Sequence, residues 1–390
     1  MVDHHSLYDL SPLLHLMLLG IIIALGPLTW VWLRGRRRGP AGRLALLTGV
    51  TLFLTFDLVL FGAFTRLTDS GLGCPDWPGC YGKASPIGAR EQIAAAQEAM
   101  PLGPVTFPKA WIEMIHRYWA TGVGVLIIAL AFMSWRDRDR IQLSVFWPMM
   151  TLFWVCLQGA FGALTVTMKL FPAIVTLHLL GGMALLALLR LQAVRYQQGE
   201  ALATGQLHQA VLVMKASTRR WLWIAFAVVW MQIALGGWVS TNYAVLACRD
   251  FPMCQGSWWP EMDFAAGFQI WRELGMQRSG EGIPFPALTA IHYTHRLAAF
   301  GVLALLGWLA WRLWRVDGLP RQAAWLVGLC AWQLLTGLSN VVLEWPLLAA
   351  VSHTGGAAGL IVVMTGWLTA SYPVRDRRTV AAPYRSGASA

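Results

Sequence analysis

Two stretches of the chain, WIEMIHRYWATGVG (111–124) and TAIHYTHRLAAFGV (289–302), decide the fold. Both are apolar segments with a histidine followed directly by arginine, His116 in the first and His295 in the second. Ionisable side chains are costly inside a membrane and usually mark function there. The likeness of two distant segments indicates an internal duplication, with one histidine-bearing helix of this kind in each copy.

A second pair of segments, AIVTLHLLGG (173–182) and AAVSHTGGAA (349–358), repeats this pattern with His178 and His353. Each copy therefore has two apolar helices with a histidine toward the same end, which we expect within the first two turns. Neutral imidazole is a good axial ligand of haem iron, and two facing helices can hold the iron from both sides. The sequence predicts two haem-type sites, one in each copy.

The composition is that of a membrane protein. Of the 390 residues, 57% are hydrophobic and 13% are charged. Apolar runs of roughly 20 residues recur, long enough to cross a bilayer as helices. The first run could be a signal peptide, but its start is acidic (Asp3, Asp9) and basic residues follow it, so we keep it as a span. We predict an all-α integral membrane protein with spans at about 11–33, 43–66, 110–134, 143–166, 171–194, 219–241, 287–311, 323–343 and 348–371.

Basic residues are concentrated in alternate connections between these runs. They are Arg34, Arg36, Arg37, Arg38, Arg43, Arg136, Arg138, Arg140, Arg190, Arg195, Lys215, Arg219, Arg220, Arg312, Arg315, Arg321, Arg375, Arg377, Arg378 and Arg385. Positive loops face the cytoplasm, so we expect an outer N-terminus, a cytoplasmic C-terminus and a bacterial-type inner (plasma) membrane. The net charge of +11 comes with no basic helix or aromatic surface, so we expect no nucleic-acid partner.

The two long outer connections, 67–108 and 242–286, each carry one cysteine pair. Cys74 matches Cys248 at an offset of 174, and His178 matches His353 at 175. Because each copy begins on the same side, we predict two parallel pseudo-repeated four-helix bundles plus one extra N-terminal span. The expected parts are an extra helix with a basic loop (1–42), an N-terminal bundle (43–200), a linker (201–218), a C-terminal bundle (219–372) and a cytoplasmic tail (373–390).

The outer side of a membrane is oxidising, so the loop cysteines are expected as disulfides. The candidates are Cys74, Cys80, Cys248 and Cys254. Zinc binding is the rival, but neither loop has a histidine or a third cysteine. A catalytic thiol role also stays open. We interpret Cys156 and Cys330, which lie within spans, as small core residues.

A bare zinc or copper ion could use the same four histidines. Neither bundle offers a third strong ligand at matching depth in both copies, so we favour haem. Small residues flank the histidines and would leave room for a flat macrocycle, although glycine also mediates tight packing of membrane helices. These residues are Gly122, Gly124, Gly181, Gly182, Gly355 and Gly356.

The copies differ beside the first histidine of each pair. Glu113 stands three residues before His116, where His292 stands before His295. That spacing stacks the side chains on one helix face, so Glu113 could accept a proton and His292 could bind a propionate. Arg117, Arg296 and Arg66 are further candidates for haem propionates, with interfacial snorkelling as the alternative. The asymmetry suggests one reactive site and one electron-transfer site.

These motifs resemble the haem A synthase family over about 43–372. The stretches that carry the resemblance are TRLTDSGLGCPDWPGC (65–80), EMIHR (113–117), HLLGG (178–182), HYTHR (292–296) and SHTGG (352–356). The resemblance implies an oxidoreductase that converts the C8 methyl of haem O into a formyl group by successive hydroxylations, giving haem A for cytochrome oxidase. The extra helix at 11–33 departs from the usual eight-span plan of the family.

The resemblance also assigns roles. Substrate haem would bind at His116 and His178 with Glu113 as the catalytic acid/base, while His295 and His353 would be the iron ligands of a haem b cofactor. The pair Cys74 and Cys80 would have a redox or structural role. Expected partners are haem O, a haem O synthase, cytochrome oxidase assembly factors and membrane lipid. The sequence leaves a homo-oligomer, the electron acceptor and the oxygen source open.

Two other functions fit parts of the pattern. A bis-haem b electron carrier linked to quinol would use the same histidine pairs, but it has no need of an acid at one site only. A transporter of parallel repeats would need polar groups at the bilayer midplane. Asp57 is the one clear candidate for such a group, and span 6 has no equivalent.

Overall fold

The computed structural model describes residues 11–141 and 143–374. The acidic start at Asp3 and Asp9 lies outside the described residues, as do four basic residues of the predicted tail, Arg375, Arg377, Arg378 and Arg385. Within the described residues, nine helices are long and apolar enough to cross a membrane, which confirms the predicted all-α membrane fold. They are α1 (Ser11–Gly35), α2 (Pro40–Leu67), α4 (Phe107–Arg136), α6 (Phe146–Thr167), α7 (Pro172–Ala203), α8 (Ala216–Thr241), α10 (Phe285–Arg315), α11 (Pro320–Val342) and α12 (Leu347–Ala370).

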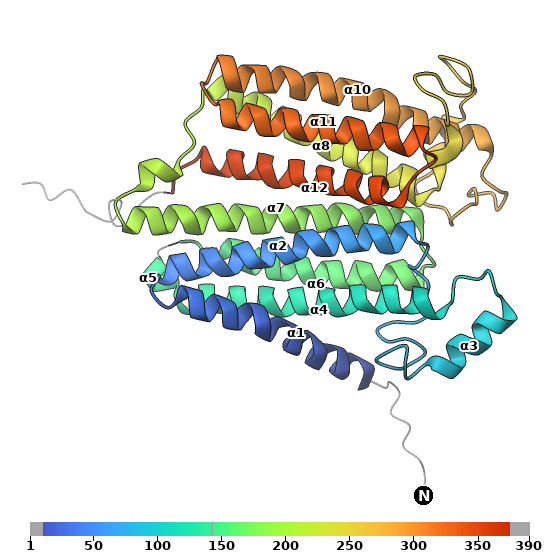
Figure 1. Ribbon diagram of the computed structural model, residues 1–390, viewed down its shortest axis with the longest axis horizontal. Coiled ribbons are helices and arrows are strands. Elements are labelled where there is room, and N and C mark those ends of the chain that lie inside the picture. Colours follow the sequence, from blue (N-terminus) through green and yellow to red (C-terminus); the bar gives the residue numbers. More distant parts are fainter. Residues whose placement is uncertain (1–10, 142, 375–390) are drawn as a thin grey trace, which may run out of the picture.

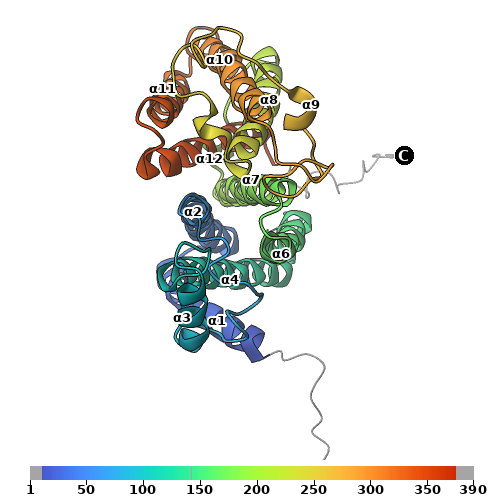
Figure 2. The same ribbon diagram turned by 90° about the vertical axis from the view of Figure 1, so that its right-hand side faces the viewer.

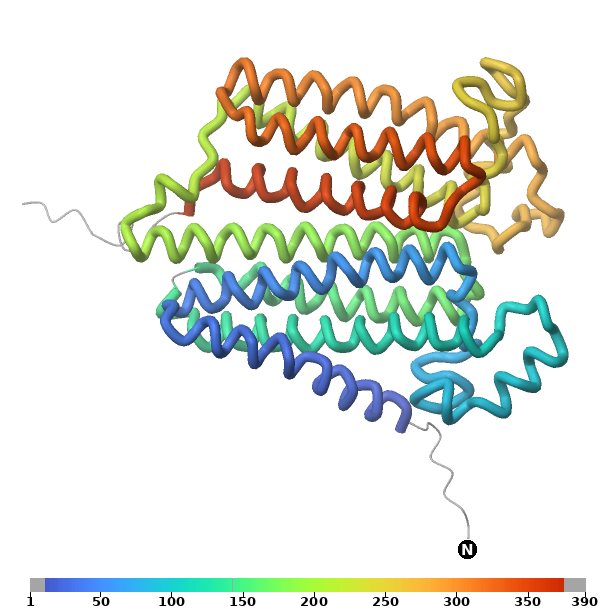
Figure 3. The backbone as a smooth tube through the Cα atoms, in the orientation of Figure 1, coloured from blue at the N-terminus to red at the C-terminus, as the bar shows by residue number. Residues whose placement is uncertain are grey.

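The long helices run side by side, and the two connections that carry the cysteine pairs lie at the same end of the molecule (Figure 1). We call this the disulfide end. The turns after α1, α4 and α10 and the linker after α7 lie at the opposite end, as the trace in Figure 3 also shows. The shorter helices are α3 (Arg90–Ala99), α5 (Arg138–Ile141), η1 (Leu207–Ala210), η2 (Ala244–Ala247) and α9 (Phe264–Gly267).

Two bundles are stacked against each other, as the end-on view in Figure 2 shows. The N-terminal half contains α2, α4, α6 and α7, with α1 packed along α4; the C-terminal half contains α8, α10, α11 and α12. Helix α7 contributes to both cores. Its Leu185 and Leu189 belong to the buried cluster of the N-terminal half, while Met183 and Leu186 belong to that of the C-terminal half.

Local sequence accounts for several helix ends. Proline stands at the start of α2, α7 and α11, where its missing N–H is not needed. At α4, the side chain of Thr106 accepts from the backbone N–H of Lys109, so the helix begins at Phe107, three residues before the predicted span. Because α4 begins at Phe107 and α10 at Phe285, both ahead of the predicted spans, His116 and His295 lie in the third turn of their helices, one turn further in than predicted.

The accessory helix α1 packs on the back of α4 through small residues. A methyl group placed on Gly20 would come within 2.5 Å of the Thr121 side chain, and one on Gly122 within 2.8 Å of Ile23. The two backbones therefore approach as closely as small residues allow. One prediction is wrong here: Cys156 of α6 is exposed on the outside of the bundle, where lipid would surround it, rather than in the core.

Candidate functional site

The N-terminal half brings His116 of α4 and His178 of α7 close enough to interact electrostatically. The ring of His116 stacks on Phe61 of α2, with centroids 6.3 Å apart and planes 12° from parallel. Nδ1 of each histidine is buried and has no hydrogen-bond partner among the described residues. Packing alone positions these two rings.

The C-terminal half brings His295 of α10 and His353 of α12 together in the same way. Here Nδ1 of each ring has a partner. Nδ1 of His353 lies 2.9 Å from the hydroxyl of Thr336 in α11, and Nδ1 of His295 lies 3.0 Å from Nε2 of Gln232 in α8. Neither partner is predictable from the sequence, because both lie on other helices and no spacing rule connects them to the histidines.

Each histidine faces a glycine of a neighbouring helix. The glycines leave room for the imidazole edge, because a methyl group on them would lie within 2.9 to 3.5 Å of the Cε1 atom. The pairs are Gly62 with His116, Gly162 with His178, Gly236 with His295, and Gly337 with His353. These glycines match between the halves at offsets of 174 and 175, as a duplication predicts.

The glycines that we expected to leave space for a macrocycle mostly serve helix packing instead. Gly122 contacts Ile23 of α1, Gly181 contacts Gln158, and Gly355 contacts Leu60. Among the remaining expected glycines, Gly182 lies near Val59, Gly356 contacts Trp332 and Gln333, and a methyl group on Gly124 would meet no described atom within 4 Å. The four glycines that face the histidines are the relevant small residues.

Both cysteine pairs are joined as predicted, Cys74 to Cys80 and Cys248 to Cys254. Each pair closes a tight loop around an aspartate whose carboxylate accepts two backbone N–H groups. Asp76 accepts from Tyr81 and Gly82, and Asp250 accepts from Gln255 and Gly256. The hydrogen bonds from these N–H groups hold the pKa of Asp250 below its usual value.

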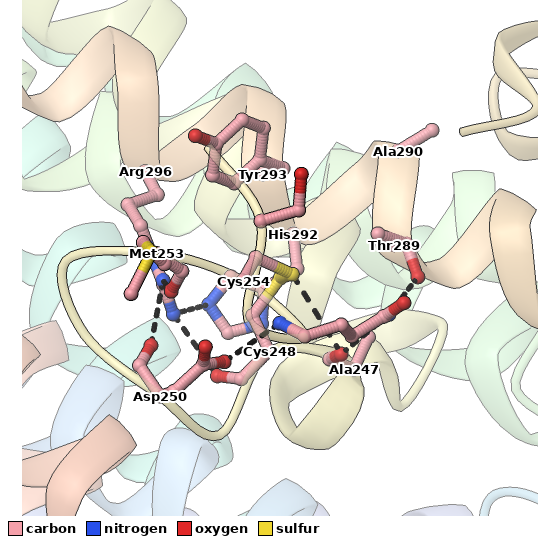
Figure 4. Close-up of a disulfide and its surroundings, with 12 residues drawn as sticks. Ala247, Cys248, Asp250, Met253, Cys254, Thr289, Ala290, His292, Tyr293 and Arg296 are labelled. Atoms are coloured by element: carbon pink, nitrogen blue, oxygen red, sulfur yellow. Dashed lines mark hydrogen bonds between the residues drawn. A yellow bond between two sulfur atoms is a disulfide. The ribbon is translucent and has the colours of Figure 1, made fainter. Parts of the chain in front are cut away.

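The arginine after each first histidine binds the disulfide loop of its own half. Arg117 donates to the carbonyl oxygens of Asp76, Pro78 and Gly79. Arg296 donates to those of Cys248, Asp250 and Met253, as Figure 4 shows. These guanidinium groups anchor the loops over the ends of the histidine helices, and the propionate role expected for them stays a prediction. Arginine suits this role because its planar fork presents several donors at once.

Glu113 and His292 occupy matching places and both contact the loops. The buried Glu113 carboxylate accepts from the backbone N–H of Cys74, at 2.8 Å, and from Arg117. His292 donates from Nδ1 to the carbonyl oxygen of Ala244 at 3.1 Å, and its Nε2 lies 3.4 Å from a guanidinium nitrogen of Arg296. Both nitrogens of His292 are thus engaged by protein, so of the two histidines on α10 only His295 has Nε2 without a partner among the described residues.

Arg66 at the disulfide end of α2 connects the two halves. It donates to the carbonyl oxygen of Ser240 at 2.7 Å and lies over the ring of Tyr243, 4.0 Å from the centroid. Tyr243 in turn donates to Asp69, which also pairs with Arg66 at 3.3 Å. We refer to Arg66, Asp69, Ser240 and Tyr243 as the Arg66 bridge. The propionate role expected for Arg66 stays a prediction.

The residues present fit a haem in each half. The four iron-ligand candidates are His116, His178, His295 and His353. Their Nε2 atoms have no hydrogen-bond partner among the described residues. Each of these side chains also keeps part of its surface accessible. The described chain contains no group of three or more histidine, cysteine, aspartate or glutamate side chains that could hold a bare metal ion. A pair of imidazoles is what a haem iron takes as axial ligands.

The chain is thus a multi-pass membrane protein with two stacked four-helix bundles. Each bundle has a pair of histidines and a loop closed by a disulfide. A family model described as COX15-CtaA, cytochrome oxidase assembly protein, matches residues 45–365. The chain belongs to this family. The match begins inside α2, so α1 lies outside the part that the family shares.

Curated relatives extend over most of the chain. A protein named heme A synthase from Shewanella oneidensis is 39% identical over 326 residues, 83% of this chain and 94% of the relative. Proteins of the same name from Symbiobacterium thermophilum and Halalkalibacterium halodurans are 27% and 26% identical and cover 83% and 76% of this chain and 93% and 86% of their own lengths.

Proposed function

We propose that this chain is a haem A synthase, an oxidoreductase that converts the C8 methyl group of haem O into a formyl group. The observation that carries the proposal is that two matched histidine pairs differ in the residue three places before the first histidine. Glu113 stands in one half and His292 in the other. Within the described residues, only the N-terminal half then has a buried carboxylate beside its histidines.

Substrate haem O binds in the N-terminal half, between His116 and His178, and a haem b cofactor is held by His295 and His353. When bound, the haems supply the oxidative chemistry and the path for electrons. The protein orients the substrate and keeps the site between helices dry. Glu113 is suited to take up protons released at the methyl group, since it is buried one turn before His116.

The contacts of Glu113 explain how its position is kept. The carboxylate is held between the N–H of Cys74 and the guanidinium of Arg117, so the disulfide loop and the histidine helix share one acid. A protonated Glu113 would lose part of this hydrogen bonding, because a carboxylic acid is a weaker acceptor than a carboxylate. Proton uptake is therefore coupled to the loop, whereas His292 at the matching place has no carboxylate to couple in this way.

The orientation follows from charge. The disulfide end faces the outside of a bacterial-type inner membrane, where disulfides form, and the arginine-rich end with Arg34, Arg136 and Arg312 faces the cytoplasm. We infer an outer N-terminus and a cytoplasmic C-terminus. Haem O synthase and cytochrome oxidase assembly factors are the partners that a synthase of this kind requires on either side of its reaction.

The test is extraction and mass analysis of haem from purified protein, expressed with and without a supply of haem O. Haem b together with haem O, a hydroxylated form of haem O or haem A would support the synthase. Two haem b per chain, with haem O available and unmodified, would instead identify a bis-haem b electron carrier. A His353→Ala variant should lose haem b, and a His116→Ala variant should keep it.

A further inference from the structure

The two histidine pairs differ in what holds Nδ1 of each ring. In the C-terminal half, Thr336 and Gln232 lie at Nδ1 of His353 and His295, 2.9 and 3.0 Å away. In the N-terminal half, Nδ1 of both histidines is buried without a partner among the described residues. The difference concerns the atom that controls how strongly an imidazole binds iron through its other nitrogen.

The residues at the matching positions explain the difference. The glycine contacts align Gly62 with Gly236 and Gly162 with Gly337, so the helices that carry them correspond position by position. On this alignment the equivalent of Gln232 is Leu58, and the equivalent of Thr336 is Phe161. Both polar partners of the C-terminal half are thus replaced by apolar side chains in the N-terminal half.

Thr336 fixes the protonation of His353. Its hydroxyl donates to the carbonyl oxygen of Trp332 at 2.7 Å, so toward His353 it can only accept. Nδ1 of His353 therefore carries the proton, and the lone pair of Nε2 is free for iron. Donation from Nδ1 also raises the basicity of the ligand nitrogen, which strengthens its bond to iron.

Gln232 acts on His295 through its amide, which also donates to the carbonyl oxygen of His295 at 3.0 Å. Iron at Nε2 of His295 requires a proton on Nδ1, and that proton needs an acceptor. The Oε1 atom of Gln232 is buried and has no partner among the described residues. A half-turn of the amide would bring Oε1 to Nδ1 and provide this acceptor, in exchange for the hydrogen bond that Nε2 now donates to the carbonyl oxygen of His295.

The N-terminal pair offers no such acceptor within the described part of the chain. A haem bound at Nε2 of His116 or His178 leaves a buried Nδ1–H without a partner, and an unsatisfied buried donor is unfavourable. Phe61 stacks on His116 and keeps the ring in place without adding a hydrogen bond. Haem binding in this half is therefore weaker per ligand, although the two helix pairs have the same overall arrangement.

We propose that Thr336 and Gln232 are positioning residues that make the C-terminal half retain its haem permanently, while Leu58 and Phe161 at the matching positions allow the N-terminal half to release haem. A synthase has to release its product and keep its cofactor, so the proposal deepens the proposed function and rests on it for the identity of the two haems. These four residues take no part in the chemistry at the iron. They determine how long a haem stays bound in each half.

The test measures transfer of haem from the full-length purified protein to an excess of apomyoglobin, together with the midpoint potential of the retained haem. Thr336→Val and Gln232→Leu should each speed loss of the slowly released haem by about 10-fold or more, the usual effect of removing such a partner. Both should raise its midpoint potential, since a less basic ligand favours ferrous iron. Thr336→Ser, which keeps the hydroxyl, should restore both values.

The reciprocal variant Leu58→Gln/Phe161→Thr should slow release of the second haem, so that product haem stays bound during purification. Unchanged transfer rates and potentials in Thr336→Val and Gln232→Leu, in protein that retains wild-type helix content, would overturn the proposal. Failure of the synthase function is distinguishable, because unmodified haem in the wild-type extract would overturn that function while the two release rates still test the difference between the halves.

Discussion

The N-terminal and C-terminal halves place four histidines in matching surroundings but surround them with different chemistry. In both halves a glycine lies against each imidazole, and an arginine anchors the loop that the disulfide closes. They differ at Glu113 and His292, and at the partners of Nδ1. The shared features keep the two sites alike in shape, and under the proposed function the differences distinguish a site that binds and releases substrate haem from a site that retains its cofactor. The following variants test that distinction.

The largest effect is expected for Glu113→Gln. The amide oxygen can still accept from the N–H of Cys74, but the side chain cannot take up a proton, so conversion of haem O should fall by about 100-fold or more. Haem A formation is measured in membranes, and haem b content serves as the folding control. The matched variant His292→Gln in the other half should reduce activity far less. A Glu113→Gln protein with nearly full activity would limit Glu113 to anchoring the loop.

A smaller effect is expected where glycine faces histidine. In Gly236→Ala the new methyl group would lie 2.9 Å from Cε1 of His295, so the ring must shift and part of the haem b should be lost. Gly162→Ala, at 3.5 Å from His178, should be tolerated. Gly124→Ala is the control, because nothing described lies within 4 Å of the added methyl group and alanine favours helix by up to about 1 kcal/mol. Equal haem content in all three variants would contradict the proposal that Gly236 positions the His295 imidazole for haem binding.

Substitutions of the two loop arginines, Arg117 and Arg296, compare the halves at a similar loss of thermal stability. Arg117→Lys and Arg296→Lys each replace a fork that reaches three carbonyl oxygens by a single ammonium group. Both should lower thermal stability, by about 1.5–3 kcal/mol per charged hydrogen bond lost. Only Arg117→Lys also weakens the contact with Glu113, because one ammonium group cannot reach the loop carbonyls and the carboxylate as the guanidinium does, so it should reduce activity more than Arg296→Lys does. Equal activity losses at equal stability would argue against a special role for Glu113.

The smallest effect concerns pH. Backbone N–H groups of Gly256 and Gln255 lower the pKa of Asp250. The stability that this carboxylate gives to its loop is present above the ordinary aspartate pKa of about 4 and is lost as the pH falls through the lowered value. Limited proteolysis of the loop between pH 5 and pH 2, using an acid-active protease, should show this opening. Asp250→Asn should abolish the pH dependence and leave haem release at neutral pH unchanged.

Much of this could be predicted from the sequence, because periodic apolar runs and repeated histidines are local signals. The nine spans, the disulfides and the four histidines all follow from spacing along the chain. The partners of the histidines do not. Which face of α8 or α11 turns toward a given imidazole depends on helix rotation and packing, so Gln232 and Thr336 looked like ordinary polar residues in apolar runs.

The arginines show the same limit from the other side. Their position next to His116 and His295 suggested propionate binding, which stays a prediction, but it gave no sign that both guanidinium groups reach back to loops about 40 residues away in the sequence. A tight loop closed by a disulfide exposes several carbonyl oxygens in one direction, and only the folded loop shows where they point. The matched aspartates Asp76 and Asp250 were visible in the sequence, but their function as loop caps was not.

Helix α1 has a consequence for how a fatty substrate reaches the first site. Thr121 and Gly122, which it covers, lie five and six residues after His116 and so on the far side of α4 at 3.6 residues per turn. The back of α4, which would otherwise touch lipid tails, is thereby sealed from the bilayer. A molecule that approaches this half from within the membrane therefore cannot enter across the part of α4 that α1 covers.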